Sequence, residues 1–164
     1  MMKYAILTLL ISCLFGAEIV AQDKSNTIVD KDLSIQFTVP EGWTVTKKES
    51  GYLMGSSTIS GFMMLEIQSF DSLNQLKTAM EAGIEQKDGT MLMPSGDLRL
   101  LGDQGVSGMY KGKIDNEEMT GFMMALFPPY EKKAAICISV APSKLFNQSN
   151  MDQLKMLLRS IIFL

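Results

Sequence analysis

VSGMYKGKIDNEEMTGFMMALF, residues 106–127, is the stretch of sequence that decides the fold. Its two halves, 106–114 and 119–127, are strand-like segments that flank the polar pair Asp115-Asn116, and we predict that they form an antiparallel hairpin across this pair. Pro128-Pro129 follows directly and ends the second strand, because proline has no N–H to donate to a ladder. An antiparallel pair of this length indicates a protein built mainly on a β-sheet.

Further strand patterns lie on both sides of the hairpin. Leu33, Ile35, Phe37 and Val39 alternate with polar residues, which is the period of a half-buried strand. The tetrapeptide 39–42 that follows predicts a β-turn with proline in second place and glycine in fourth. Additional strands are expected from Trp43 onward and over residues 52–56, 62–70, 90–93, 97–101 and 133–140.

Two segments show helical periodicity. Ser72 and Gln75 fit a capping box, and apolar residues follow at spacings of three and four. That stripe consists of Leu73, Leu76, Met80 and Ile84, and Asp88-Gly89 is the expected stop.

A second helix is predicted over about 150–160, capped by Ser149 or Asn150, and the apolar tail 161–164 should dock on the sheet. The stripe of this helix consists of Met151, Leu154, Leu158 and Ile161. Strands dominate, and too few helices intervene for a parallel sheet. The expected class is therefore α+β: an antiparallel sheet of about six strands with two main helices packed on it.

The first 21 residues are typical of a secretory signal peptide. Lys3 gives a short positive region, an apolar run follows, and Ala21 ends a plausible cleavage site. We therefore expect one α+β domain over residues 22–164, exported to the periplasm or the medium. An alternative is a lipoprotein anchored at Cys13, which follows Leu10-Ile11-Ser12. After removal of the signal, Cys137 is the only cysteine, so no internal disulfide is possible, and its apolar neighbours predict a buried thiol on a strand.

The composition argues against several classes of function. The chain has 164 residues, 15 basic and 18 acidic side chains, a net charge of −3 and no histidine. Catalytic triads and imidazole metal sites are therefore excluded, and a mildly acidic chain is a poor match for nucleic acid. We expect no enzymatic activity, no cofactor and, after the signal segment, no membrane-spanning segment. The enzyme alternative is a hydrolase that uses convergent carboxylates.

Methionine is the conspicuous residue, with 14 copies. Phe62-Met-Met-Leu65 and Phe122-Met-Met-Ala-Leu-Phe127 are apolar on both strand faces, so one face must cover the core and the other must lie under a helix or line an apolar groove. The candidate ligand contacts are Phe62, Met64, Phe122 and Met124.

The strand at 133–140 has one face of small side chains, formed by Ala135, Cys137 and Ser139. We favour this face as the surface that seats a helix, because the two helices need somewhere to bury their apolar stripes. An alternative use of the methionines is Cu(I) binding, since thioethers are soft ligands and Met91 and Met93 share a strand face.

The segment Ile35-Gln-Phe-Thr-Val-Pro-Glu-Gly-Trp43 resembles the opening of PsbP-like and DcrB-like domains. The later order of a hairpin, a helix near 72–87, several strands and a C-terminal helix ending in Ser-Ile-x-Phe is also similar, over about residues 27–164. The resemblance implies a PsbP-like sandwich around an antiparallel sheet, and accessory or chaperone-like binding without catalysis.

Together, these patterns predict an exported, non-enzymatic binding or accessory domain. It would contact a protein partner or an apolar ligand through its sheet. The sequence does not specify the identity of that partner or the oligomeric state.

Overall fold

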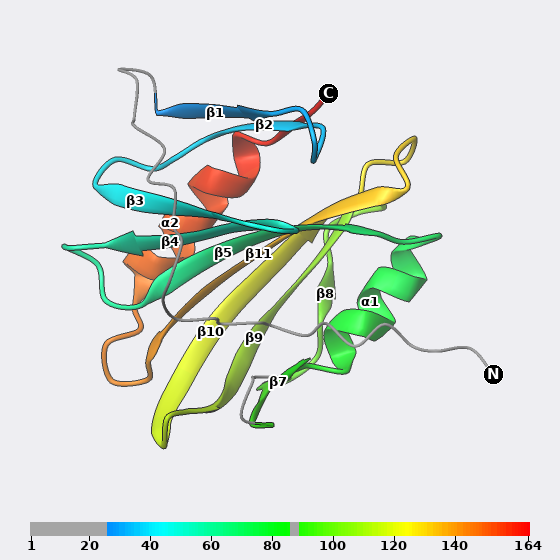
Figure 1. Ribbon diagram of the computed structural model, residues 1–164. Coiled ribbons are helices and arrows are strands. Elements are labelled where there is room, and N and C mark those ends of the chain that lie inside the picture. Colours follow the sequence, from blue (N-terminus) through cyan, green and yellow to red (C-terminus); the bar gives the residue numbers. More distant parts are fainter. Residues whose placement is uncertain (1–25, 86–88) are drawn as a thin grey trace.

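The computed structural model describes residues 26–85 and 89–164, which form two antiparallel sheets and two helices (Figure 1). The larger sheet has nine strands and curls into a half-barrel. Its strands, in spatial order, are β3 (Trp43–Lys48), β4 (Gly51–Ser56), β5 (Phe62–Ser69), β11 (Lys133–Pro142), β10 (Glu117–Leu126), β9 (Gly105–Ile114), β7 (Met91–Pro94) and β6 (Ile84–Glu85), with β8 (Arg99–Leu100) beside β9.

The α+β class is confirmed, but the expected sheet of about six strands is wrong. Two of the nine strands, β6 and β8, are only two residues long, which is too short for side-chain alternation to indicate them. The first predicted strand also does not belong to the main sheet. It becomes β2 (Ile35–Thr38) in a separate three-stranded sheet with β1 (Thr27–Asp30) and β12 (Ile162–Phe163).

The central hairpin forms as predicted. Ile114 pairs with Glu117 at its end, and β10 then pairs with β11 along almost its whole length. Asp115 and Asn116 have φ values of 51° and 65°. Positive φ at both central residues is what a two-residue type I′ turn requires, and Asn and Asp adopt it more readily than most residues.

The turn after β2 is displaced by one residue from its predicted position. The N–H of Trp43 donates to the carbonyl of Pro40 at 3.2 Å, so the turn spans 40–43 rather than 39–42. Glycine is therefore in third place, where Gly42 has a φ of 79°. That position of a type II turn requires a positive φ, which explains the shift.

Helix α1 (Leu73–Glu81) is shorter than predicted. The Ser72 side chain accepts from the N–H of Gln75 at 3.2 Å, as expected. The Gln75 side chain, however, accepts from the N–H of Asp71 instead of from the N–H of Ser72, so the capping box is not complete. Gly83 has a φ of 82° and ends the helix, so Ile84 belongs to β6. Of the predicted stop Asp88-Gly89, Asp88 lies outside the described residues.

Helix α2 (Gln148–Arg159) begins two residues earlier than predicted, because Asn147 is its N-cap and forms a capping box with Asn150. Its buried side is formed by Asn150, Leu154, Leu157 and Leu158. The amide of Asn150 donates to the carbonyl of Ser60 at 2.9 Å, which explains why a polar residue takes a place in the stripe that was expected for Met151. The tail beyond the helix pairs with β2 rather than lying on the main sheet.

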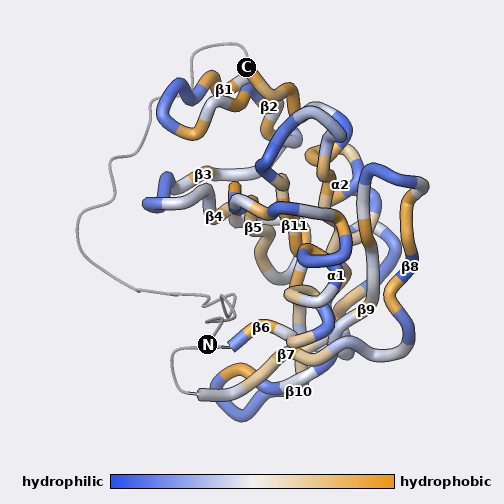
Figure 2. Tube along the Cα trace, turned by 90° about the vertical axis from the view of Figure 1, so that its right-hand side faces the viewer, coloured by the Kyte–Doolittle hydropathy of each residue, from blue (hydrophilic) through white to orange (hydrophobic). Residues whose placement is uncertain are grey.

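The main sheet has an apolar core on each face. The α1 face contains Met64, Met123 and Ile138 together with Leu76 and Met80 of α1. The α2 face contains Met54, Met63 and Cys137 together with three leucines of α2 and the inner side of the small sheet. Figure 2 accordingly shows that the strands in the middle of the molecule are mostly hydrophobic and that most turns are hydrophilic. Both faces of the sheet therefore contribute to stability.

A buried polar network joins the small sheet to the large one. The carboxylate of Asp30 on β1 accepts from the Tyr52 hydroxyl at 2.5 Å and from Lys47 Nζ at 2.9 Å, and it also accepts from the N–H groups of Asp32 and Leu33. Burial alone would raise the pKa of Asp30, but these hydrogen bonds outweigh it and lower the pKa to about 2. Burial and the same bond raise the pKa of Tyr52.

Candidate functional site

The four predicted ligand contacts do not share one surface. Phe62 pairs with Val140 and Met64 with Ile138, and both partners belong to the α1 face. Phe122 and Met124 pair instead with Ser139 and Cys137, which point to the α2 face. The structure therefore brings Phe62 and Met64 together, and separates them from Phe122 and Met124 by the thickness of the sheet. The role of these four residues in ligand contact stays a prediction.

Phe122 and Met124 belong to the surface on which α2 rests. Both are half-buried members of the cluster that includes Leu154, Leu157 and Leu158 of α2. The ammonium of Lys155 lies 6.0 Å from the centre of the Phe122 ring, so the helix also shields this aromatic side chain from above.

The small-residue side of β11 seats α2, as predicted. Ala135 and Cys137 are fully buried in the same cluster as Leu157. Short side chains let the helix approach the strand closely, so its leucines reach the sheet. Burial raises the pKa of the Cys137 thiol, which keeps it protonated and unreactive. The prediction of a buried thiol on a strand is confirmed.

The α1 face is less fully covered at its β3 end. Helix α1 packs over β7 and β9, at the far side of the curled sheet from β3 and β4. On β4 the residues that point to the α1 face are Gly51, Leu53 and Gly55, and Phe62 flanks them from β5. Leu53 and Phe62 are both only partly buried. We call the surface formed by Thr44, Thr46, Leu53, Gly55 and Phe62 the β4 surface.

Gly55 is the strand glycine with the most open space around it. Among the described residues, a Cβ atom placed there would find a single neighbour within 4 Å, the Thr44 hydroxyl at 3.7 Å. Most other strand glycines are packed tightly: a Cβ on Gly51 would meet the backbone of Leu65, and one on Gly112 would meet the backbone of Met91. Space for an additional group therefore exists beside Phe62, on the apolar side of the sheet.

A half-buried carboxylate closes one end of the β4 surface. Glu66 follows Met64 on the α1 face of β5 and pairs across the ladder with Gly51 and Ile136. Burial raises the pKa of Glu66, and the hydrogen bond from the Gln68 amide at 2.9 Å only partly opposes this. Among the described residues no cation forms an ion pair with Glu66.

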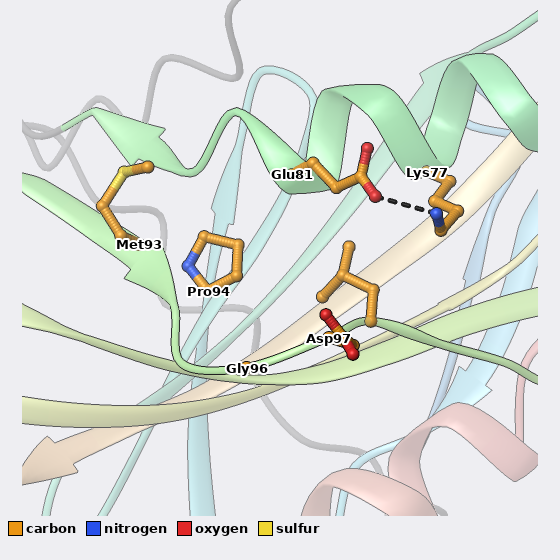
Figure 3. Close-up of a pocket in the computed structure, with 7 residues that line it drawn as sticks. Lys77, Glu81, Met93, Pro94, Gly96 and Asp97 are labelled. Carbon is orange, nitrogen blue, oxygen red and sulfur yellow. Dashed lines mark ion pairs between the residues drawn. The ribbon is translucent and has the colours of Figure 1, made fainter.

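A cavity of about 350 Å³ lies between α1 and the β7–β8 connection (Figure 3). Lys77 and Glu81 line it from the helix, and their ion pair spans 2.8 Å. Asp97 and the apolar side chains Pro94 and Leu98 line the opposite side. Two carboxylates thus reach one hollow, but Glu81 is already held by Lys77, so the site does not present the pair of free acids that a glycosidase needs.

A second cavity, of about 460 Å³, lies where α2 ends beside the small sheet. Its walls are mostly apolar and include Val39, Pro40 and Met156, with Glu41 and Arg159 as its two charged residues. These opposite charges flank an apolar floor, and the hydroxyl groups of Thr38 and Ser160 also line the cavity.

The methionines proposed for Cu(I) are neighbours in space. A Cβ placed on Gly83 would lie 2.6 Å from Met93 Sδ and 3.4 Å from the terminal carbon of Met91, so both side chains fold over this glycine. This packing covers the end of α1. Within residues 26–85 and 89–164, no group of three His, Cys, Asp or Glu side chains could hold a metal ion.

Sequence reasoning missed the open position on the β4 surface. A weak signal for it was present, because Gly51 and Gly55 are four positions apart and so point to the same face of one strand. The network around Asp30 was also missed, because β1 is four residues long and its partners Lys47 and Tyr52 lie on different strands.

No protein-family model and no curated protein matches the sequence. A crystal structure of a protein from Bacteroides thetaiotaomicron VPI-5482 has a similar fold, with a TM-score of 0.58 over 87% of this chain. The two sequences are 9% identical, and the chain corresponds to 49% of that protein, about half its length. At this identity the likeness concerns the fold alone. Within the described residues, no helix has the length and apolar character needed to cross a membrane.

Proposed function

We propose that this protein is an exported, non-enzymatic binding domain that holds an apolar segment of a partner protein, or an apolar ligand, on the β4 surface. The observation that carries the proposal is the open position at Gly55 beside the partly buried Leu53 and Phe62. Binding sites generally combine apolar side chains with a few polar groups at their rim. Thr44 and Glu66 supply such polar groups here.

The protein itself gives a precedent for this mode of contact. On the α2 face, a strand of small residues accepts the leucines of α2 between larger side chains. On the α1 face, β4 presents glycines at two of three positions, with Phe62 and Met64 on the neighbouring strand. Of the four residues predicted from the sequence, the proposal keeps Phe62 as a contact; Met64 is buried in the core of the α1 face, and Phe122 and Met124 support α2.

The test uses two substitutions at one position. Gly55→Ala adds a methyl group in ordinary van der Waals contact, whereas Gly55→Lys places a charged side chain over the apolar surface. Neither needs an unusual backbone angle, so both should fold. The probe is the uncharged dye Nile red, whose fluorescence rises when it binds exposed apolar surface. Gln36→Val, on the small sheet, is the control for a neutral surface change.

We expect saturable dye binding by the unsubstituted protein, by Gly55→Ala and by Gln36→Val, and at least a tenfold loss of affinity in Gly55→Lys with an unchanged melting temperature. Undiminished binding by a folded Gly55→Lys would refute the proposed site. The same set of variants, used to recover partners from the exporting cell, then identifies the natural occupant.

A further inference from the structure

Two walls of the cavity shown in Figure 3 are fixed to neighbouring residues of β9. The Tyr110 hydroxyl donates to the carbonyl of Met80 at 2.8 Å, and this bond holds the end of α1. The N–H of Ser95 donates to the carbonyl of Met109 at 2.7 Å, and this bond holds the start of the β7–β8 connection. The spacing between the two walls is therefore set by one strand of the main sheet.

Asp97 lies in the β7–β8 connection, on the wall opposite α1 (Figure 3). Gly96, directly before it, has a φ of 104°, a backbone conformation that residues with a side chain rarely adopt. Leu98, directly after it, packs on Gly108, where an added Cβ atom would collide with the leucine side chain. The connection is thus held on both sides of Asp97, so the position of this carboxylate is defined.

The charges that line the cavity favour a cation. Lys77 and Glu81 pair at 2.8 Å, whereas the carboxylate of Asp97 has no ion-pair or hydrogen-bond partner within residues 26–85 and 89–164. The lining therefore has one negative charge in excess. A divalent metal ion is a poor match, because Ca²⁺ and Mg²⁺ take about six or more oxygen ligands and no group of three acidic, Cys or His side chains is present in the described part of the chain.

The remaining side chains of the lining are apolar. They belong to Met93, Pro94 and Leu98, so a cation that carries an apolar group could bury this group while its charge meets Asp97. The cavity volume of about 350 Å³ is near the lower end of the range for small-molecule sites, about 300–1,000 Å³. This size favours a small organic molecule over a segment of a partner protein.

We propose that this cavity binds a small organic cation, a primary ammonium attached to an apolar group, and that the ammonium donates to Asp97 and Glu81. Lys77 contacts Oε1 of Glu81, so Oε2 can accept from the ligand. A hydrogen bond between an ammonium and a carboxylate is charge-assisted and about twice as strong as one between neutral groups. The inference goes beyond binding on the β4 surface and uses none of its residues.

The experiment compares three probes of nearly equal size that differ in charge: phenethylammonium, the uncharged phenethyl alcohol and the anion phenylacetate. Each is titrated into the isotope-labelled full chain, and NMR follows the backbone amide signal of Gly96. Asp97→Asn removes the charge at almost unchanged size, and Asp103→Asn is the matched control, because Asp103 is also exposed but does not line the cavity. Lys77→Gln releases Glu81 from its ion pair.

We expect saturable binding of phenethylammonium, with an affinity about fivefold or more above that of either other probe. Asp97→Asn should remove this preference and Asp103→Asn should keep it. Lys77→Gln should raise the affinity for phenethylammonium about threefold, since the cavity then gains a second unpaired carboxylate. A purely apolar cavity would bind the three probes alike and respond to neither Asp97→Asn nor Lys77→Gln. That result, no binding of phenethylammonium, or an unchanged preference in Asp97→Asn overturns the inference.

Discussion

The two faces of the main sheet have similar apolar content but differ in how completely they are covered. On the α2 face, the small side chains of β11 carry a helix, and Leu154 and Leu157 are fully buried against them. On the α1 face, the β4 surface has an open glycine and two partly buried apolar residues. Small residues on a strand therefore indicate a place for something to pack, and only the fold shows whether the chain itself fills it.

The largest expected loss of stability comes from a substitution under α2, on the covered face of the sheet. Leu154→Ala leaves a cavity under α2 and should lower the free energy of unfolding by about 2–5 kcal/mol. Leu53→Ala removes a similar side chain from the β4 surface, where it is only partly buried, and should cost about 1 kcal/mol. Urea unfolding measures both. Equal losses would show that the β4 surface is ordinary core.

The buried network around Asp30, which joins the small sheet to the large one, should make the free energy of unfolding depend on pH in the acidic range. The pKa of Asp30 is lowered from its ordinary 3.8 to about 2, and the side chain is 2% exposed. The stabilisation, about 2 kcal/mol, is therefore fully present above pH 4 and is lost as the pH falls through 2. Tyr52→Phe removes the largest favourable contribution and should shrink this dependence. An unchanged pH profile of unfolding in Tyr52→Phe would contradict the assignment.

Two glycines on the same side of the molecule should respond oppositely to alanine. Gly55→Ala adds a methyl group in open space and reduces the freedom of the unfolded chain, so stability should rise by about 0.5 kcal/mol. Gly61→Ala is the contrast: its φ is 95°, and the new methyl group would collide with the carbonyl of Val140. Thermal unfolding should show that loss clearly. A destabilised Gly55→Ala would mean that the β4 surface is already filled.

The smallest effect concerns the carboxylate at the end of the β4 surface. Burial raises the pKa of Glu66, so the folded state binds its proton more tightly than the unfolded state. Stability should therefore fall slightly as the pH rises through the folded pKa, and Glu66→Gln should abolish this fall and stabilise the protein at pH 7. Unfolding measured between pH 4 and 8 tests the sign. Lower stability of Glu66→Gln at pH 7 would indicate that the charge makes a favourable contact.

The sequence could not predict which side chains from different strands lie on the same face of the sheet. The central hairpin and the seat of α2 on Ala135 and Cys137 follow from alternation within single strands, and both are confirmed. The grouping of Phe62 with Phe122 failed because residues on different strands share a face only if the register places them so, and here β10 is offset by one. Likewise Gly83, not the later Asp88-Gly89, ends α1, since either glycine fits the pattern and the adjoining β6 decides between them.

Site-specific photo-crosslinking in the cells that produce the protein shows directly whether a partner occupies the β4 surface. A photoreactive amino acid at Thr46, on the rim of the β4 surface, is compared with one at Met156, a 55% exposed position on α2. We expect a discrete adduct from Thr46 that Gly55→Lys abolishes, and none of that mass from Met156. The absence of an adduct at Thr46, or the same adduct from both positions, would refute a binding site on the β4 surface.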